Sequence, residues 1–237
     1  MNMTRKKRVA VLISGRGSNM KTLAEAAMGK STPYEIVGVI SDKPGAAGLN
    51  HANALDIEAQ AIIRADHADK ASHETAVDAQ LKRWNVDLIA LAGYMRLLSP
   101  AFVERWQGRM INIHPSLLPL FRGLDTHRRA LDAGLRVHGC TVHFVTAEMD
   151  GGPIIAQAAV PVLPDDSEES LTRRVLAAEH QLYPMALDLV ATGRAQLVGN
   201  RVAFDNLGAT SERGIVISPA IGNGGEPDLE QLARFTP

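Results

Sequence analysis

Three residues of this chain bring together an amide, an imidazole and a carboxylate: Asn112, His114 and Asp150. Asn112 and His114 stand two positions apart in a run that Pro115 ends, and residues two apart on a strand point to the same face of a sheet. An amide that holds a carbonyl oxygen, beside an imidazole that moves a proton, suits acyl transfer or a related attack on a carbonyl carbon. Asp150 taken alone is more typical of a turn, because Asp-Gly is itself a turn signal.

A glycine-rich turn, Ser14-Gly15-Arg16-Gly17-Ser18-Asn19, leads from an apolar run into a helical pattern. Backbone N–H groups at the start of a helix, together with the helix dipole, favour a bound phosphate, and Ser18 and Asn19 can both donate to it. The dinucleotide-binding fingerprint would need a small residue at Met20, so a Rossmann cofactor site is disfavoured. A tight turn without a ligand is the alternative that the motif leaves open.

A carboxylate on a late helix is the third candidate. Glu179 comes four residues after Val175, at the margin of an apolar stripe. An acid on an inward-leaning face is costly unless it meets a partner. That partner is either Arg173 or Arg174, in an ion pair, or a bound ligand, and the sequence leaves both open.

For two residues near expected strand ends, the sequence allows either a structural or a functional role. Arg96 directly follows a buried-looking strand and is either a surface charge or part of a pocket rim. His143 alternates with Val142 and Phe144, which is compatible with a buried structural role or with a functional one. None of the eight histidines stands in an H-E-x-x-H pattern or beside paired cysteines, so the sequence predicts no metal site.

Short β-branched runs alternate with helical patterns along most of the chain. The alternation predicts an α/β fold, an open, twisted, mainly parallel sheet with helices on both faces, of Rossmann-like type. Such sheets carry their sites at the carboxyl ends of the strands, where His114 falls. The expected strands are Val9–Ser14, Glu35–Ser41, Ala61–Arg64, Val86–Ala92, Met110–His114, Thr141–Val145 and Ile154–Val162.

The clearest helix signal comes late in the chain. Asp166 and Glu169 are expected to form a cap before the stripe beside Glu179, and Pro184 is expected to end or kink this helix. After Gly193 the pattern weakens. We therefore expect a basic N-terminal tail over residues 1–7, one catalytic domain over 8–199 and a C-terminal appendage over 200–237.

The charge balance and the cysteine content limit the partners and the compartment that we expect for this protein. Lys plus Arg total 25 against 26 for Asp plus Glu, so no global positive field attracts nucleic acid or an anionic membrane. No stretch approaches the roughly 20 apolar residues of a membrane span. The single Cys140 cannot form an internal disulfide, which fits a reducing cytoplasm. We expect a cytoplasmic protein with small-molecule substrates, no nucleic acid and no membrane partner, as a monomer or a homodimer.

Five motifs in order resemble those of the phosphoribosylglycinamide formyltransferases, a folate-dependent formyltransferase family. The resemblance covers roughly residues 8–198, and five motifs in register are far more specific than one. They are Ser14-Gly15-Arg16-Gly17-Ser18-Asn19, Ala92-Gly93-Tyr94-Met95-Arg96-Leu97-Leu98-Ser99, Asn112-Ile113-His114-Pro115-Ser116-Leu117-Leu118-Pro119, Asp150-Gly151-Gly152-Pro153 and Ala178-Glu179-His180.

The resemblance implies transfer of a formyl group from 10-formyltetrahydrofolate, as co-substrate, to the amine of phosphoribosylglycinamide, without a metal. The oxyanion would be stabilised by the Asn112 amide and a protonated His114, and Asp150 would favour the imidazolium. Asp125 stands where the family more often has His or a small residue, which puts local loop contacts in doubt. The other implied contacts are Gly17, Ser18 and Asn19 with the phosphate, Glu179 with the glycinamide, and Lys70, Met95, Arg96, Leu97, Leu98 and Asn112 with the folate.

Related formyl enzymes are the alternatives. Methionyl-tRNA formyltransferase would need a basic C-terminal domain, whereas residues 200–237 are short and carry three Arg against five acids. Formyltetrahydrofolate deformylase would carry a regulatory domain before the first strand, which is expected at Val9. A nucleotide-binding module without catalysis would use only the glycine-rich turn and would not need Asn112 or Asp150.

Overall fold

The structure, a computed structural model, describes residues 5–205. Within them, seven strands form one sheet in the order β3-β2-β1-β4-β5-β6-β7, and β8 pairs with β9 in a hairpin. The strands are β1 (Lys7–Ile13), β2 (Tyr34–Ser41), β3 (Ala59–Ala61), β4 (Leu88–Leu91), β5 (Met110–His114), β6 (Val137–Phe144), β7 (Ile154–Pro161), β8 (Ala195–Val198) and β9 (Arg201–Phe204). The helices are α1 (Ser18–Ala27), α2 (Ala47–Asn53), α3 (Lys70–Arg83), α4 (Pro100–Arg105), α5 (Thr126–Asp132) and α6 (Glu168–Ala191), with a 3₁₀ turn η1 (Arg64–Asp66).

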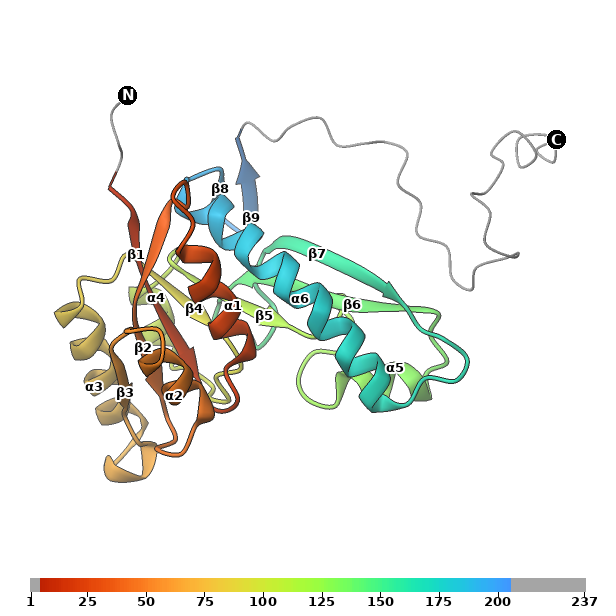
Figure 1. The fold of residues 1–237 in the computed structure, drawn as a ribbon, viewed down its shortest axis with the longest axis horizontal. Helices are drawn as coiled ribbons and strands as arrows, with labels where there is room; N and C mark the ends of the chain where they lie inside the picture. The colour runs from red at the N-terminus through yellow and green to blue at the C-terminus, as the bar shows by residue number, and fades with distance from the viewer. Residues whose placement is uncertain (1–4, 206–237) are drawn as a thin grey trace.

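The sheet is mainly parallel, as expected. Neighbouring strands from β3 through β5 run parallel, whereas β6 and β7 are antiparallel additions at one edge. The alternation of side chains along each strand separates two apolar cores, one on each face. Val9, Val11 and Ile13 pack toward α1, α2 and α6, while Ala10 and Leu12 pack toward α3 and α4. Helices therefore cover both faces of the sheet (Figure 1).

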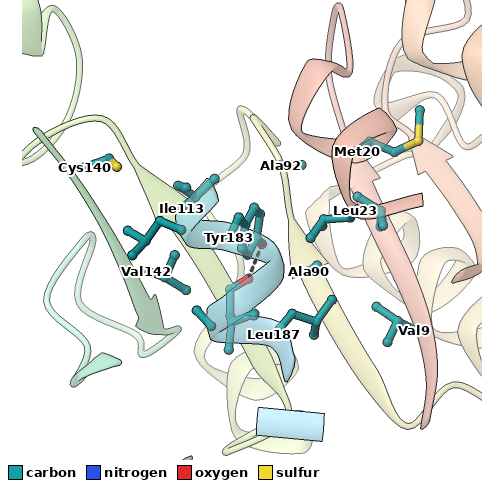
Figure 2. Packing of buried hydrophobic residues seen from close by; sticks show 14 of the residues in the cluster. Val9, Met20, Leu23, Ala90, Ala92, Ile113, Cys140, Val142, Tyr183 and Leu187 are labelled. Carbon is teal, nitrogen blue, oxygen red and sulfur yellow. Dashed lines mark hydrogen bonds between the residues drawn. The ribbon is translucent and has the colours of Figure 1, made fainter. Parts of the chain in front are cut away.

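Helix α6 crosses the sheet and carries the largest part of one core (Figure 1). Its Tyr183 is fully buried, and the hydroxyl donates to the carbonyl oxygen of Leu91 on β4 at 2.9 Å and lies 3.4 Å from that of Ile111 on β5. Figure 2 shows Tyr183 among apolar side chains from the strands and from α1. The hydroxyl thus donates its one hydrogen mainly to the carbonyl at the carboxyl end of β4, with the carbonyl near the start of β5 close by.

Helix α6 differs from the expectation at its N-cap and at Pro184. Ser167, and not Asp166, is the N-cap, in a capping box with Ser170, while Asp166 instead receives a two-pronged ion pair from Arg174. Pro184 does not end the helix, because α6 continues through it to Ala191. Buried residues lie on both sides of Pro184, and their burial outweighs one lost backbone hydrogen bond.

Two expected strands are shifted. The strand expected at Ala61–Arg64 is β3 at Ala59–Ala61, and η1 follows it. The strand expected at Thr141–Val145 begins earlier, at Val137, because β6 pairs along its whole length with β7. Local β-branched content does not reveal this pairing, since Gly139 lies inside the paired region.

Both expected boundaries of the catalytic domain fall next to or inside regular secondary structure. Lys7 already belongs to β1, and Arg5 pairs with Asp87 at 2.9 Å. The expected boundary between 199 and 200 falls in the β8–β9 turn, so residues 201–204 pair with the strand before it. The remainder of the expected appendage, residues 206–237, and residues 1–4 lie outside the described residues. Within residues 5–205, none of the helices combines the length and apolar character that crossing a bilayer needs.

Candidate active site

The amide and the imidazole come from alternate positions at the carboxyl end of β5. Ile111 and Ile113 pack into the core beneath α6, which turns Asn112 and His114 to the opposite face. His114 is buried, and its cross-strand partner on β6 is Thr141, while Asn112 lies opposite His143. Strand β5 therefore presents both groups side by side, as the sequence predicted.

Both ring nitrogens of His114 face acceptors. Nε2 lies 3.0 Å from the carbonyl oxygen of Phe121, and Nδ1 lies 3.4 Å from Oδ2 of Asp150. A carbonyl oxygen and a carboxylate each accept a hydrogen bond, so the arrangement suits a ring with an N–H at both positions. The geometry accommodates the imidazolium form of His114.

Asp150 reaches His114 from the loop between β6 and β7. The backbone N–H of Gly123 donates to Oδ2 of Asp150 at 2.9 Å, and Asp150 itself has a φ of 50°. Gly152 allows the loop to pack closely, because a Cβ at this position would lie 1.7 Å from the carbonyl oxygen of Phe144. The loop therefore brings Asn112, His114 and Asp150 into one site.

Two β6 side chains that the sequence did not assign contact this site. Nε2 of His143 lies 3.2 Å from Nδ2 of Asn112, and Nδ1 lies 2.9 Å from the carbonyl oxygen of Phe144. Burial lowers the pKa of His143, although the Phe144 carbonyl and Asp150 act in the opposite direction. The alternation of His143 in a strand was visible in the sequence, but its position opposite Asn112 depends on strand register.

Thr141 holds the loop that follows β5. Its hydroxyl accepts from the backbone N–H of Leu118 at 3.0 Å and donates to the carbonyl oxygen of Ser116 at 2.7 Å. Gln157 of β7 donates to the same hydroxyl at 2.9 Å and to the carbonyl oxygen of Leu118 at 2.9 Å. These bonds fix the segment that carries the Phe121 carbonyl to His114, and no sequence motif indicated Thr141 or Gln157.

The glycine-rich turn meets Glu179 at the start of α1. Gly17 is the N-cap, with a φ of 74°, and a Cβ there would lie 2.6 Å from Cα of Gly48. No side chain of the described residues caps α1, so the first N–H groups, at Ser18 and Asn19, remain available to an anion. Nδ2 of Asn19 donates to Oε2 of Glu179 at 2.6 Å. The structure therefore brings Gly17, Ser18, Asn19 and Glu179 together.

Glu179 does not pair with either neighbouring arginine. Arg173 pairs with Glu169, and Arg174 pairs with Asp166. Burial raises the pKa of Glu179, and the Asn19 hydrogen bond only partly offsets that shift. Among its possible partners, Glu179 thus contacts Asn19 of the glycine-rich turn and neither arginine.

A cavity of about 430 Å³ lies beside the segment that follows β4. Lys70 and Arg64 line it together with the four residues Met95, Arg96, Leu97 and Leu98. Met95 and Leu97 are large apolar side chains that are exposed at this cavity. The structure therefore brings Lys70 to the segment that the sequence analysis assigned to the folate.

The segment from Met95 to Leu98 is held at both ends. The Met95 N–H donates to the Ser14 hydroxyl at 2.8 Å, and Nε of Arg96 pairs with Oδ2 of the buried Asp42 at 2.5 Å. At the far end, the Ser99 N–H donates to Glu74 at 2.7 Å. Arg96 therefore lines the cavity rim while bonded to the end of β2, so its role is not that of an isolated surface charge.

A second cavity, of about 400 Å³, is lined in part by Asp150. It is lined by Arg122, by Gly151 and Gly152, and by residues 200–202 of the hairpin. Within residues 5–205, no three His, Cys, Asp or Glu side chains are placed to hold a metal ion together.

Known proteins resemble this chain in sequence and in fold. The formyl transferase family model matches residues 7–187. Phosphoribosylglycinamide formyltransferase of Haemophilus influenzae is 42% identical over 199 residues, which cover 84% of this chain and 94% of that protein. The crystal structure of phosphoribosylglycinamide formyltransferase from Brucella melitensis has 56% sequence identity and a TM-score of 0.77, covering 80% of this chain and 97% of that one.

A larger protein contains a similar segment. The trifunctional purine biosynthetic protein adenosine-3 of Bos taurus is 47% identical over 196 residues, which cover 83% of this chain but only 19% of that protein. The chain thus spans about a fifth of the length of these longer relatives. By its family match and by its likeness to the bacterial enzymes over nearly their whole length, the chain belongs to the formyl transferase family, among the phosphoribosylglycinamide formyltransferases.

Proposed function

We propose that the protein transfers the formyl group of 10-formyltetrahydrofolate to the amine of N1-(5-phosphoribosyl)glycinamide, giving the formylated nucleotide and tetrahydrofolate in de novo purine synthesis. One observation carries the assignment of the chemistry: Asp150, from a distant loop, lies 3.4 Å from His114, beside Asn112. The likeness to bacterial enzymes of this name supports the choice of substrates.

The proposed reaction starts with attack of the glycinamide nitrogen lone pair on the formyl carbon, which moves the C=O electron pair onto oxygen. The Asn112 amide donates to the oxyanion, and the positive charge of His114 stabilises it in a buried site. The oxyanion then collapses, and the bond between the formyl carbon and the folate nitrogen breaks. A proton passes from the attacking nitrogen to that leaving nitrogen through His114, Asp150 or an ordered water.

In this proposal, Asp150 keeps His114 charged and oriented. Its carboxylate faces Nδ1 of the ring while the Phe121 carbonyl faces Nε2. An imidazolium held between two acceptors presents a fixed positive charge to the developing oxyanion. The charge therefore needs no rearrangement during the reaction.

Two binding regions flank these groups. The uncapped start of α1, at Gly17, Ser18 and Asn19, is proposed to hold the phosphate, and Glu179 the glycinamide. Met95, Arg96, Leu97 and Leu98 are proposed to hold the pterin in the 430 Å³ cavity, with Asn112 at its formyl end. Lys70 at the rim of that cavity is proposed to attract a folate carboxylate, with Arg64 beside it.

We further expect the reaction to take place in the cytoplasm, with the protein acting as a monomer or homodimer without nucleic acid. The near balance of 25 basic and 26 acidic residues supports the absence of a nucleic acid partner. The buried free Cys140 is compatible with a reducing compartment, because burial raises its thiol pKa to about 12 and keeps it unreactive.

An acceptor comparison tests the proposal. The protein is incubated with 10-formyltetrahydrofolate and, separately, phosphoribosylglycinamide, methionyl-tRNA or water alone, and formyl transfer is followed. We expect rapid transfer only to phosphoribosylglycinamide, unchanged after treatment with a chelator. Formylation of the tRNA alone, or release of free formate alone, would assign the protein to another formyl enzyme.

A further inference from the structure

We propose that His143 is a positioning residue, which holds the Asn112 side chain so that its N–H, and not its carbonyl oxygen, points to the formyl oxygen. The inference rests on the proposed function, since it assumes that Asn112 is the oxyanion donor. His143 does not touch the substrates in this account and acts through Asn112.

Strand pairing places the two side chains opposite each other. Asn112 of β5 and His143 of β6 are register partners in an antiparallel pair, where opposing Cβ atoms approach to about 4.5–5.5 Å. The pairing of β6 with β7 shifts register between Val142 and His143. The His143 ring lies within hydrogen-bond distance of the Asn112 amide.

The Phe144 carbonyl decides which nitrogen of His143 carries the proton. A carbonyl oxygen can only accept, so Nδ1, 2.9 Å away, must be the N–H. The ring is buried, which favours its neutral form, and a neutral imidazole has a single N–H. Nε2 is therefore an acceptor, and it faces Asn112 at 3.2 Å.

An acceptor at Nε2 fixes the amide of Asn112. Nδ2 donates one hydrogen to His143, which leaves its second hydrogen for the oxyanion. The opposite orientation would place the amide oxygen against Nε2, two acceptors face to face. It would also present an oxygen to the developing negative charge. Loss of one oxyanion donor typically lowers turnover about 10²–10³-fold.

None of the charged groups that act on the His143 ring is the hydrogen-bond partner of its Nε2. Asp150 Oδ1 lies 3.9 Å from Nε2, which is beyond a hydrogen bond, and His114 and Arg122 are the remaining ionisable groups whose charge acts on His143. His114 and Asp150 face each other, and Arg122 pairs with Glu148. Asn112 is thus the hydrogen-bond partner of Nε2.

Three variants separate the two ends of the His143 ring. His143→Gln places an amide oxygen near the Nε2 position, His143→Asn keeps a polar group only near Nδ1, and His143→Leu keeps neither. We expect kcat to fall about 10²-fold in His143→Asn and His143→Leu, with both KM values within about twofold, and to fall less than about tenfold in His143→Gln. A kcat within threefold of the wild type in His143→Leu, or equal losses in all three folded variants, would overturn the inference.

Two further measurements test the inference, and the first needs no His143 variant. Nitrogen-15 chemical shifts of the wild-type His143 ring should report the neutral Nδ1–H form, and the Nε2–H form would contradict the inference. In a double-mutant cycle, His143→Leu should cost far less in the Asn112→Ala background than in the wild type, whereas additive losses would contradict it. Failure of the proposed function is distinct, because it would appear as a wild-type protein that does not formylate phosphoribosylglycinamide.

Discussion

Oδ2 of Asp150 lies 3.4 Å from Nδ1 of His114, although the two residues belong to different segments of the chain. The loop that carries Asp150 is held by the Gly123 N–H, and the other nitrogen of His114 faces the Phe121 carbonyl. Residues 121–123 therefore support both partners. The contact joins an acid, an imidazole and, through β5, the Asn112 amide in one site.

Asp150→Asn should lower kcat by about 10²–10³-fold, because it removes the negative charge that favours the imidazolium. The asparagine oxygen can still accept from Gly123, so the loop should keep its place. Steady-state kinetics should show unchanged KM values, and the exposed Asp165→Asn serves as the control. Full activity in Asp150→Asn would show that the charge is not required.

Lys70→Ala should raise the KM for 10-formyltetrahydrofolate about three- to tenfold, because one partly exposed ion pair contributes on the order of 1 kcal/mol. The KM for phosphoribosylglycinamide should not change, since Lys70 lines the cavity proposed for the folate. Lys30→Ala, in the exposed turn after α1, is the matched control. An equal rise in both KM values would place Lys70 outside the folate site.

Glu179→Gln should stabilise the protein at neutral pH while weakening substrate binding. Burial raises the folded-state pKa of Glu179 above its ordinary value of 4.5, so its stabilising contribution is fully present below pH 4.5 and is lost as the pH rises through the folded-state value. The stability of the glutamine variant relative to the wild type should therefore increase with pH above 4.5. Thermal melts across this range check the sign, with the exposed Glu169→Gln as control. A difference that stays constant with pH would contradict the explanation.

Tyr183→Phe should destabilise the fold by about 1 kcal/mol, which corresponds to a fall in Tm of about 2–4 °C for a chain of this size. The reason is that the hydroxyl donates to the Leu91 carbonyl and lies close to that of Ile111 in the core. The buried hydroxyl of Tyr34 has no hydrogen-bond partner among the described residues, so Tyr34→Phe should not lower Tm. An equal fall in Tm in the two variants would contradict a stabilising role for the Tyr183 hydrogen bond.

The sequence predicted well those elements whose ends are set by neighbouring residues. Strand β5 begins and ends at the expected Met110 and His114, because Pro115 directly follows the alternating run. The edge strand β3 was misplaced, since its position depends on pairing with β2 at Val39–Ser41. Pro184 does not end α6, because the residues on both sides of it are buried, and local helix rules do not include that burial.

Some residues of the candidate site could likewise be predicted from local spacing, whereas others could not. Spacing alone placed Asn112 and His114 on one face, but the approach of Asp150 depends on how a loop folds back over the sheet. His143 and Thr141 became visible only with the register of β5 and β6. Their roles depend on non-local strand pairing, which hydrophobic alternation does not encode.

The most direct test of the central claim is a single-turnover measurement of formyl transfer by His114→Ala with both substrates bound. If His114 supplies the charge that stabilises the oxyanion, the rate of the chemical step should fall by about 10²–10³-fold while both substrates still bind. A near-normal single-turnover rate in His114→Ala would contradict the account.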